Sequence, residues 1–171
     1  NVDMYNTAVG YSAGYAVTTG IQNTFVGGLS GSALVDADYN VGVGVGALQT
    51  DTYGSKSVAV GSDTLINQNF TSATDTYNTA VGFNAGNDVT TGTVNTLIGG
   101  LAGDSLTEGN SNIAVGFESL GAEVAGDRNV AIGNYALTVQ SNASTVDTYN
   151  VGIGHNAGAA VTTGVQNTLV G

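Results

Sequence analysis

The chain has no cysteine, no proline and no tryptophan, and its only cationic side chains are Lys56 and Arg128, against thirteen acidic ones. The formal net charge of −11 repels nucleic-acid phosphates, so the chain lacks the basic footprint of a nucleic-acid-binding protein. No apolar run approaches the ~20 residues of a membrane-spanning helix. These absences predict no nucleic-acid partner and no membrane insertion by this segment. The lack of cysteine fits an extracellular protein as well as a cytosolic one.

Groups that carry catalysis are equally scarce. His155 is the single histidine, and without cysteine almost no pairing of a nucleophile with a general base remains. A transition-metal site would need further histidine or cysteine ligands. The stretch Gly42-x-Gly44-x-x-Ala47 matches a loose dinucleotide-binding pattern, but no helical period follows it. We therefore expect no enzymatic activity, no cofactor and no metal requirement for folding.

The acidic turns leave one question open. Asp36 and Asp38 share a turn, and Glu118 lies near Glu123 in the sequence. Either pair offers the carboxylate oxygens that calcium prefers. Solvated loop acids are the simpler interpretation, and the sequence does not decide between the two.

Glycine, in contrast, is abundant, with 27 residues that recur at fixed intervals. A five-residue motif, Asn-(Thr/Val/Ile)-(Ala/Gly/Phe/Leu)-(Val/Ile)-Gly, occurs ten times, once with Ser for Asn. Successive motifs lie 17 residues apart, or 21 at every fourth step, so that four steps make a block of 72 residues. A short fixed period of this kind indicates a solenoid. The motifs end at Gly10, Gly27, Gly44, Gly61, Gly82, Gly99, Gly116, Gly133, Gly154 and Gly171.

The repeat defines the expected domain organisation. We expect residues 1–171 to form a single all-β segment, a parallel β-solenoid of about ten coils, with blocks at 6–77 and 78–149 and a partial block at 150–171. Residues 2–5 match 146–149, which close a block, and neither end carries the atypical capping repeat that solenoids usually need. The sequence therefore predicts a segment cut from a longer repetitive fibre.

Side chains within each motif should alternate between two faces, as in a β-strand. The position before the terminal glycine is always Val or Ile, which we interpret as a buried core column. On this interpretation the threonines two positions earlier also point inward, which disfavours an outward array for binding ice. The small Ala or Gly between them then faces outward, and a second short strand follows each glycine. The predicted core column is Val9, Val26, Val43, Val60, Val81, Ile98, Val115, Ile132, Ile153 and Val170.

Asparagine opens nine of the ten motifs. Amides stacked at the ~4.8 Å spacing of adjacent strands can hydrogen-bond along the axis. We interpret the column as a structural ladder that fixes the register, with ligand binding as the alternative. The predicted ladder is Asn6, Asn23, Asn40, Asn78, Asn95, Asn112, Asn129, Asn150 and Asn167.

Two stretches carry a family resemblance. Ser111-Asn-Ile-Ala-Val-Gly116 and Arg128-Asn-Val-Ala-Ile-Gly-Asn-Tyr-Ala-Leu137 resemble the YadA-like head repeat of trimeric autotransporter adhesins. Similar repeats occur in phage tail-fibre-like proteins and bacterial surface fibres. The resemblance covers all ten motifs and implies a left-handed β-roll, a side-by-side homotrimer and an extracellular location, on a bacterial surface or a virion tail. The 17-residue coil departs from the family's shorter repeat.

The resemblance implies a shaft or head segment of an extracellular fibre, an adhesin or phage tail fibre that mediates attachment. Its partners would be further copies of itself, as a homotrimer or other homo-oligomer, and a host-surface glycan or protein. The thin coil supports self-association, because burying a further face adds the apolar area that a small core lacks. The alternative is a glycan-binding or ice-binding solenoid surface. For glycans, a sparse aromatic row precedes the asparagine column: Tyr5, Tyr39, Tyr77 and Tyr149.

Overall fold

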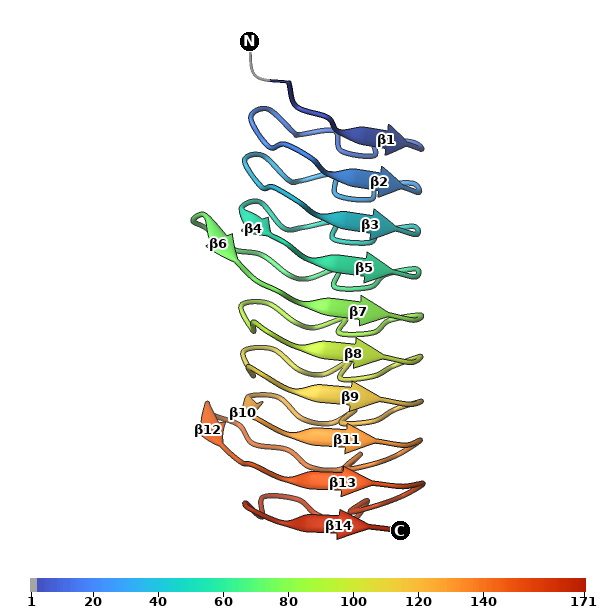
Figure 1. The fold of residues 1–171 in the computed structure, drawn as a ribbon, viewed down its shortest axis with the longest axis vertical. Helices are drawn as coiled ribbons and strands as arrows, with labels where there is room; N and C mark the ends of the chain where they lie inside the picture. The colour runs from blue at the N-terminus through green and yellow to red at the C-terminus, as the bar shows by residue number, and fades with distance from the viewer. Residues whose placement is uncertain (1–2) are drawn as a thin grey trace.

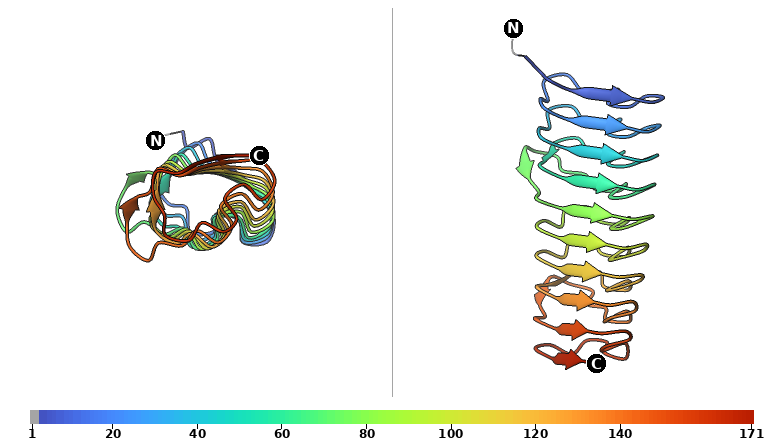
Figure 2. Two further views of the ribbon diagram at one scale, coloured as in Figure 1. Left: turned by 90° about the horizontal axis from the view of Figure 1, so that it is seen from below. Right: turned by 45° about the vertical axis from the view of Figure 1, so that its right-hand side comes forward.

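The computed structural model describes residues 3–171, so the predictions for residues 1–2 lie outside the described residues. Throughout this range the chain is all-β without a helix, and ten parallel strands stack in sequence order along one axis (Figure 1). Viewed along that axis, successive coils superimpose around a narrow oblong cross-section (Figure 2). The prediction of a parallel β-solenoid of about ten coils is confirmed.

Each strand of the main sheet is three residues long and pairs with the next in an unbroken register. In the first step Thr7 lies opposite Thr24 and Val9 opposite Val26. The strands are β1 (Thr7–Val9), β2 (Thr24–Val26), β3 (Val41–Val43), β5 (Val58–Val60), β7 (Thr79–Val81), β8 (Thr96–Ile98), β9 (Ile113–Val115), β11 (Val130–Ile132), β13 (Val151–Ile153) and β14 (Thr168–Val170).

Two longer connections step outward from the stack. In the first, β4 (Gly54–Ser55) pairs with β6 (Thr74–Asp75), and in the second, β10 (Gly126–Asp127) pairs with β12 (Val146–Asp147). β6 and β12 project beyond the neighbouring coils (Figure 1). The main sheet continues past the first of these bulges, because β5 still pairs with β7 in the same register.

The second strand expected after each terminal glycine is not formed. Residues 11–16, which follow Gly10, are turns. Ser12 and Gly14 have φ of 53° and 59°, and left-handed residues reverse the chain rather than extend it. Gly10 itself cannot carry a side chain, since an added Cβ would lie 2.6 Å from the Gly27 carbonyl oxygen of the next coil.

The predicted core column was wrong, because the Val/Ile side chains lie on the outer face. Val81 is 36% exposed and Ile98 39% exposed, whereas their neighbours Ala80 and Leu97 are fully buried. The inner position sits close to the opposite wall of its own coil, so small residues belong there, while β-branched residues favour the strand backbone on either face. The outward column is Val9, Val26, Val43, Val60, Val81, Ile98, Val115, Ile132, Ile153 and Val170.

Large and small side chains complement each other across this thin core. The Phe25 ring occupies the space beside Gly31, where an added Cβ would lie 2.5 Å from Phe25 Cε1. Gly152 in turn leaves room for Leu137, whose Cγ would be 2.9 Å from an added Cβ. The inner Ala, Gly, Leu and Phe positions thus fill the coil with little free space.

Candidate functional site

The asparagine column is buried, and each side chain bridges two coils. The backbone amide of Ser57 donates to Asn40 Oδ1 (2.8 Å), and Asn40 Nδ2 donates to the Gly54 carbonyl (2.9 Å). Direct amide-to-amide bonds also occur, as from Asn129 Nδ2 to Asn112 Oδ1 (3.1 Å). These contacts tie each strand to the coil that follows it. The fully buried members are Asn23, Asn40, Asn78, Asn95, Asn112, Asn129 and Asn150.

Two buried carboxylates hold the bulges, and the sequence analysis did not identify them. Asp51 accepts hydrogen bonds from the backbone amides of Gly54 (3.0 Å) and Phe70 (3.1 Å) and from Gln68 Nε2 (2.6 Å). Burial raises the pKa of the Asp51 carboxyl above its ordinary value, and these hydrogen bonds oppose that shift only in part. Gln68 and Phe70 belong to the first bulge, so Asp51 anchors it.

Glu123 takes the same role at the second bulge. It accepts from the Gly126 amide (2.8 Å), from Gln140 Nε2 (2.7 Å), and from the backbone amide (2.9 Å) and Nδ2 (3.0 Å) of Asn142. Gln140 Oε1 then accepts from Asn150 Nδ2 (2.9 Å), which joins the anchor to the ladder. A signal was present in the sequence: an acid followed 17 positions later by glutamine occurs twice, 72 residues apart.

Both cations of the chain lie at equivalent places before strands of the main sheet. Lys56 Nζ is 2.5 Å from Asp75 Oδ2 and 5.2 Å from the centre of the Tyr77 ring. Arg128 repeats the arrangement 5.6 Å from the Tyr149 ring centre. A cation therefore lies over one face of each of these two rings.

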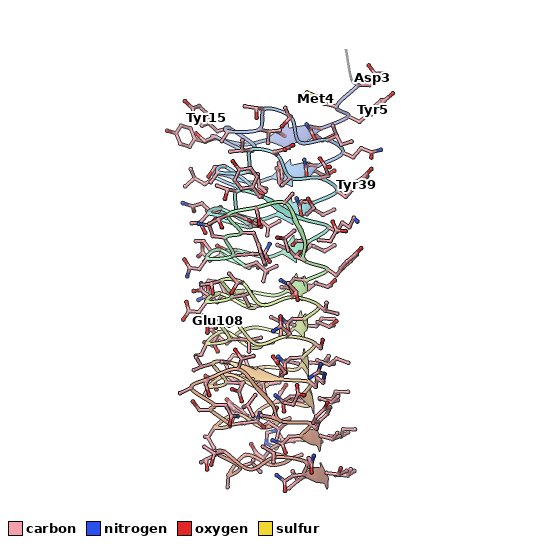
Figure 3. All side chains as sticks on the ribbon, turned by 90° about the vertical axis from the view of Figure 1, so that its left-hand side faces the viewer. Asp3, Met4, Tyr5, Tyr15, Tyr39 and Glu108 are labelled. Atoms are coloured by element: carbon pink, nitrogen blue, oxygen red, sulfur yellow. The ribbon has the colours of Figure 1, made fainter. Side chains whose placement is uncertain are left out.

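The predicted aromatic row is exposed. Tyr5 and Tyr39 project from the same side of the solenoid, opposite to Tyr15 (Figure 3). All four members have positive φ, near 50–60°. Their exposed fractions are 72% for Tyr5, 49% for Tyr39, 53% for Tyr77 and 46% for Tyr149.

The outer face of the main sheet is an uncharged, largely apolar surface, which we call the sheet wall. It consists of the first and third residue of each of the ten strands, all of them Val, Ile or Thr and none charged. The threonines expected to point inward lie on this face: Thr7, Thr24, Thr79, Thr96 and Thr168. Soluble monomers rarely expose apolar patches larger than a few hundred Å², so the wall is the main candidate interaction surface.

The acidic turns form no metal centre in the described range. Asp36 Oδ1 accepts from Thr19 Oγ1 (2.7 Å), and Asp38 Oδ1 accepts from the Ile21 amide (2.8 Å). Glu123 is fully buried and accepts hydrogen bonds from amide groups, so its carboxylate cannot join Glu118 in binding a metal ion. Across residues 3–171, no group of three or more His, Asp or Glu side chains is placed to hold a metal ion.

One small recess lies away from the wall. Its volume is about 230 Å³. Burial raises the pKa of Asp104 at this recess, and the nearby Glu118 and Asp88 carboxylates add to the shift. The lining of the recess includes two carboxylates and no cation, which gives it no evident ligand. Its lining residues are Asp104, Ser105, Glu118, Gly121, Ala122 and Thr138.

Comparison with known proteins identifies no relative: no family model, no curated protein and no solved structure matches the chain. The likeness to the adhesin head repeat therefore stays a prediction from the sequence. Within the described residues, no helix is long and apolar enough to cross a membrane.

Proposed function

We propose that the chain is a shaft or head segment of an extracellular attachment fibre, of the adhesin or phage tail-fibre kind, whose copies associate side by side through the sheet wall. The observation that carries the proposal is the wall itself, an uncharged surface of β-branched side chains along ten strands. Burying it would remove apolar area from water at ~25 cal/mol per Å². The Ala and Gly positions that the sequence analysis expected to face outward are buried, so the face left for self-association is the one that carries Val, Ile and Thr.

A further copy of the chain is the partner that fits the wall best. Side chains on the wall recur at the strand spacing of about 4.8 Å, and a partner that covers the whole wall must share that rise. Three copies arranged around one axis would bury all three walls, and three is the number that the resemblance to the adhesin head repeat implies. The pairing of Val41 with Val58, and of Val58 with Thr79 across the bulge, supports 17-residue coils with 21 at every fourth.

We also propose a structural rather than an enzymatic role. The buried acids Asp51 and Glu123 are occupied by backbone amides and glutamine side chains. Both side chains are fully buried. A role in attachment then places the segment outside the cell, on a bacterial surface or a virion tail.

Ice binding is the second candidate, because the reason that disfavoured it no longer holds. Thr24, Thr79 and Thr96 lie on the outer face, in line with Val26, Val81 and Ile98. Regular rows of hydroxyl and methyl groups on a flat sheet could order water. This candidate requires an uncovered wall, so it applies only if the chain stays monomeric.

Sedimentation of the purified chain tests the proposal. We expect a trimer at micromolar concentration, and monomers for the double variant Val81→Asp with Ile98→Asp, because each charge would be buried in the interface. The control is Thr91→Asp with Thr163→Asp, at exposed turn positions away from the wall, which should leave the trimer intact. A folded, monomeric wild-type chain would refute self-association, and thermal hysteresis in that monomer would then favour ice binding.

A further inference from the structure

The sheet wall is bordered by two edge columns, one before and one after its strands. The leading column is the residue just before each five-residue motif, from Tyr5 to Gln166, and the trailing column is the residue just after each terminal glycine, from Tyr11 to His155. Tyr5 and Tyr39 project toward the side on which the strands lie (Figure 3). None of the thirteen acidic residues lies in either column or on the wall. The absence of acids here lowers the repulsion between two copies that each carry a net charge of −11.

Both columns leave large apolar side chains exposed in the single chain. At the two ends of β7, the Tyr77 and Phe83 side chains are 53% and 59% exposed. At the two ends of β3, Tyr39 is 49% exposed and Val45 is 56% exposed. Contact between copies would remove this surface from water, and two aromatic rings attract each other in edge-to-face or offset packing.

The sizes of the two edge residues compensate each other between blocks. The ends of β3 carry Tyr39 and Val45, a large leading residue with a smaller trailing one. The ends of β9, one block later, carry Ser111 and Phe117, so the large residue has moved to the trailing edge. The strand itself lies between the two members of each pair, so they cannot touch within one chain. The compensation therefore indicates a contact between the leading edge of one copy and the trailing edge of another.

The two cations fit the same pairing. Lys56 and Arg128 lie in the leading column, and the trailing residues at the other ends of their strands, β5 and β11, are Ser62 and Asn134. Both trailing residues are uncharged and can accept a hydrogen bond from the cation of a neighbouring copy. Each cation already has an aspartate partner, so covering it leaves no charge without a partner.

We infer that the leading column of each copy packs against the trailing column of the next, with every coil level with the same coil of its neighbour. The inference rests on the proposed self-association through the wall. Rotation about a common axis keeps equivalent residues at one height, and walls that face that axis meet at their edges. Each such contact joins a leading edge to a trailing edge, because all copies run in the same direction. The partner is therefore a further copy of this chain, which supplies Val45 to Tyr39 and Phe117 to Ser111.

A size exchange at one coil tests the pairing. Val45→Phe sets a phenylalanine against Tyr39 of the next copy, and this overpacking should raise the dissociation constant of the oligomer at least about tenfold in sedimentation. Adding Tyr39→Ser reproduces the combination of Ser111 with Phe117 and should restore the wild-type constant to within about threefold. Tyr5→Ser, in the same column but two coils away, is the matched control and should give no rescue. All these positions are exposed, so each variant should keep its β-rich circular dichroism. If Tyr39→Ser rescues no better than Tyr5→Ser, the two columns do not meet.

Because the chain has no cysteine, disulfide cross-links can locate the contact. Ser111→Cys and Phe117→Cys chains that are refolded together and oxidised should form a mixed dimer. Neither variant alone should link, because a threefold axis places equivalent residues at different edges, and Ser111→Cys should not link to Val45→Cys, four coils away. Self-linking of Ser111→Cys, or no mixed product from chains that assemble like the wild type, would overturn the edge pairing and leave the proposed self-association standing. A wild-type chain that stays monomeric would refute both.

Discussion

Gln68 Nε2 donates a hydrogen bond to Asp51 Oδ2 over 2.6 Å, and both side chains are fully buried. Gln68 Oε1 accepts from Asn78 Nδ2 (2.9 Å) in turn. The donor order thus runs from the ladder through the glutamine to the carboxylate. This order requires a hydrogen-bond acceptor at residue 51.

Replacing the acceptor should weaken the anchor. In Asp51→Asn the amide can still accept from the Gly54 and Phe70 amides, but its Nδ2 then faces Gln68 Nε2, donor against donor. A buried donor left without a partner costs about 1–3 kcal/mol, so urea unfolding should show a loss of that size. Adding Gln68→Glu restores a donor–acceptor pair and should recover much of it. If the double variant is no more stable than Asp51→Asn, Gln68 Nε2 is not the donor to residue 51.

Protonation of Asp51 gives a pH dependence whose sign is fixed. Its pKa in the folded chain is raised above the ordinary value of 3.8, mainly by burial. The folded state therefore binds the proton more tightly than the unfolded state. The stability that comes from this proton is fully present below pH 3.8 and is lost as pH rises through the pKa of Asp51 in the folded chain. Burial raises the pKa of Asp104 as well. The free energy of unfolding should include a component that increases from neutral pH down to about pH 4.

The variant Asp51→Asn isolates that component. Comparing the pH profiles of the variant and the wild type cancels the contributions of the other acids. The amount by which the wild type exceeds the variant in unfolding free energy should shrink as pH rises and the wild-type carboxyl ionises. An identical profile for both chains would mean that Asp51 titrates at the same pH in the folded and unfolded states.

The ladder should be costly to interrupt at a single rung. Asn95 Oδ1 accepts from the Asn112 amide (2.9 Å), and its Nδ2 donates to the Gly109 carbonyl (2.9 Å). Asn95→Ala leaves both buried groups without partners, and we expect a loss of about 2–5 kcal/mol in unfolding free energy. The exposed neighbour Ser111→Ala should change it by less than about 0.5 kcal/mol. Equal losses of unfolding free energy for the two variants would show that the asparagine column does not stabilise the fold.

The sequence predicted the parallel stack and the number of coils because the same residue types return at each coil. The sequence analysis placed the wrong face inside. Val81 and Ala80 alternate in either orientation, and a column of β-branched residues fits both a buried face and an exposed strand. The choice depends on the width of the coil, a tertiary property that shows only in packing such as Phe25 against Gly31. Asp51 was missed because an isolated acid reads as a loop residue until its partners are known.

Modularity gives the most direct test of the repeat. Deleting residues 78–149 joins Tyr77 to Asn150, and the junction Asp-Thr-Tyr-Asn then has the same sequence as the native one. Gln68 would meet Asn150 in place of Asn78, the type of contact that Gln140 already makes with Asn150 (2.9 Å). Because coils interact chiefly with their neighbours, the shortened chain should stay folded.

The length of the shortened chain and a mismatched deletion complete this prediction. Four strands fewer at a spacing of about 4.8 Å should shorten the particle by roughly 19 Å, which small-angle X-ray scattering can measure. Deleting only residues 78–90 removes less of the chain but shifts the inner Ala and Leu positions out of line with the coils on either side, so outer Val and Ile would be forced inward. That variant should aggregate or unfold at a lower temperature. If instead the short deletion is tolerated and the block deletion is not, the 72-residue block is not the structural unit of this solenoid.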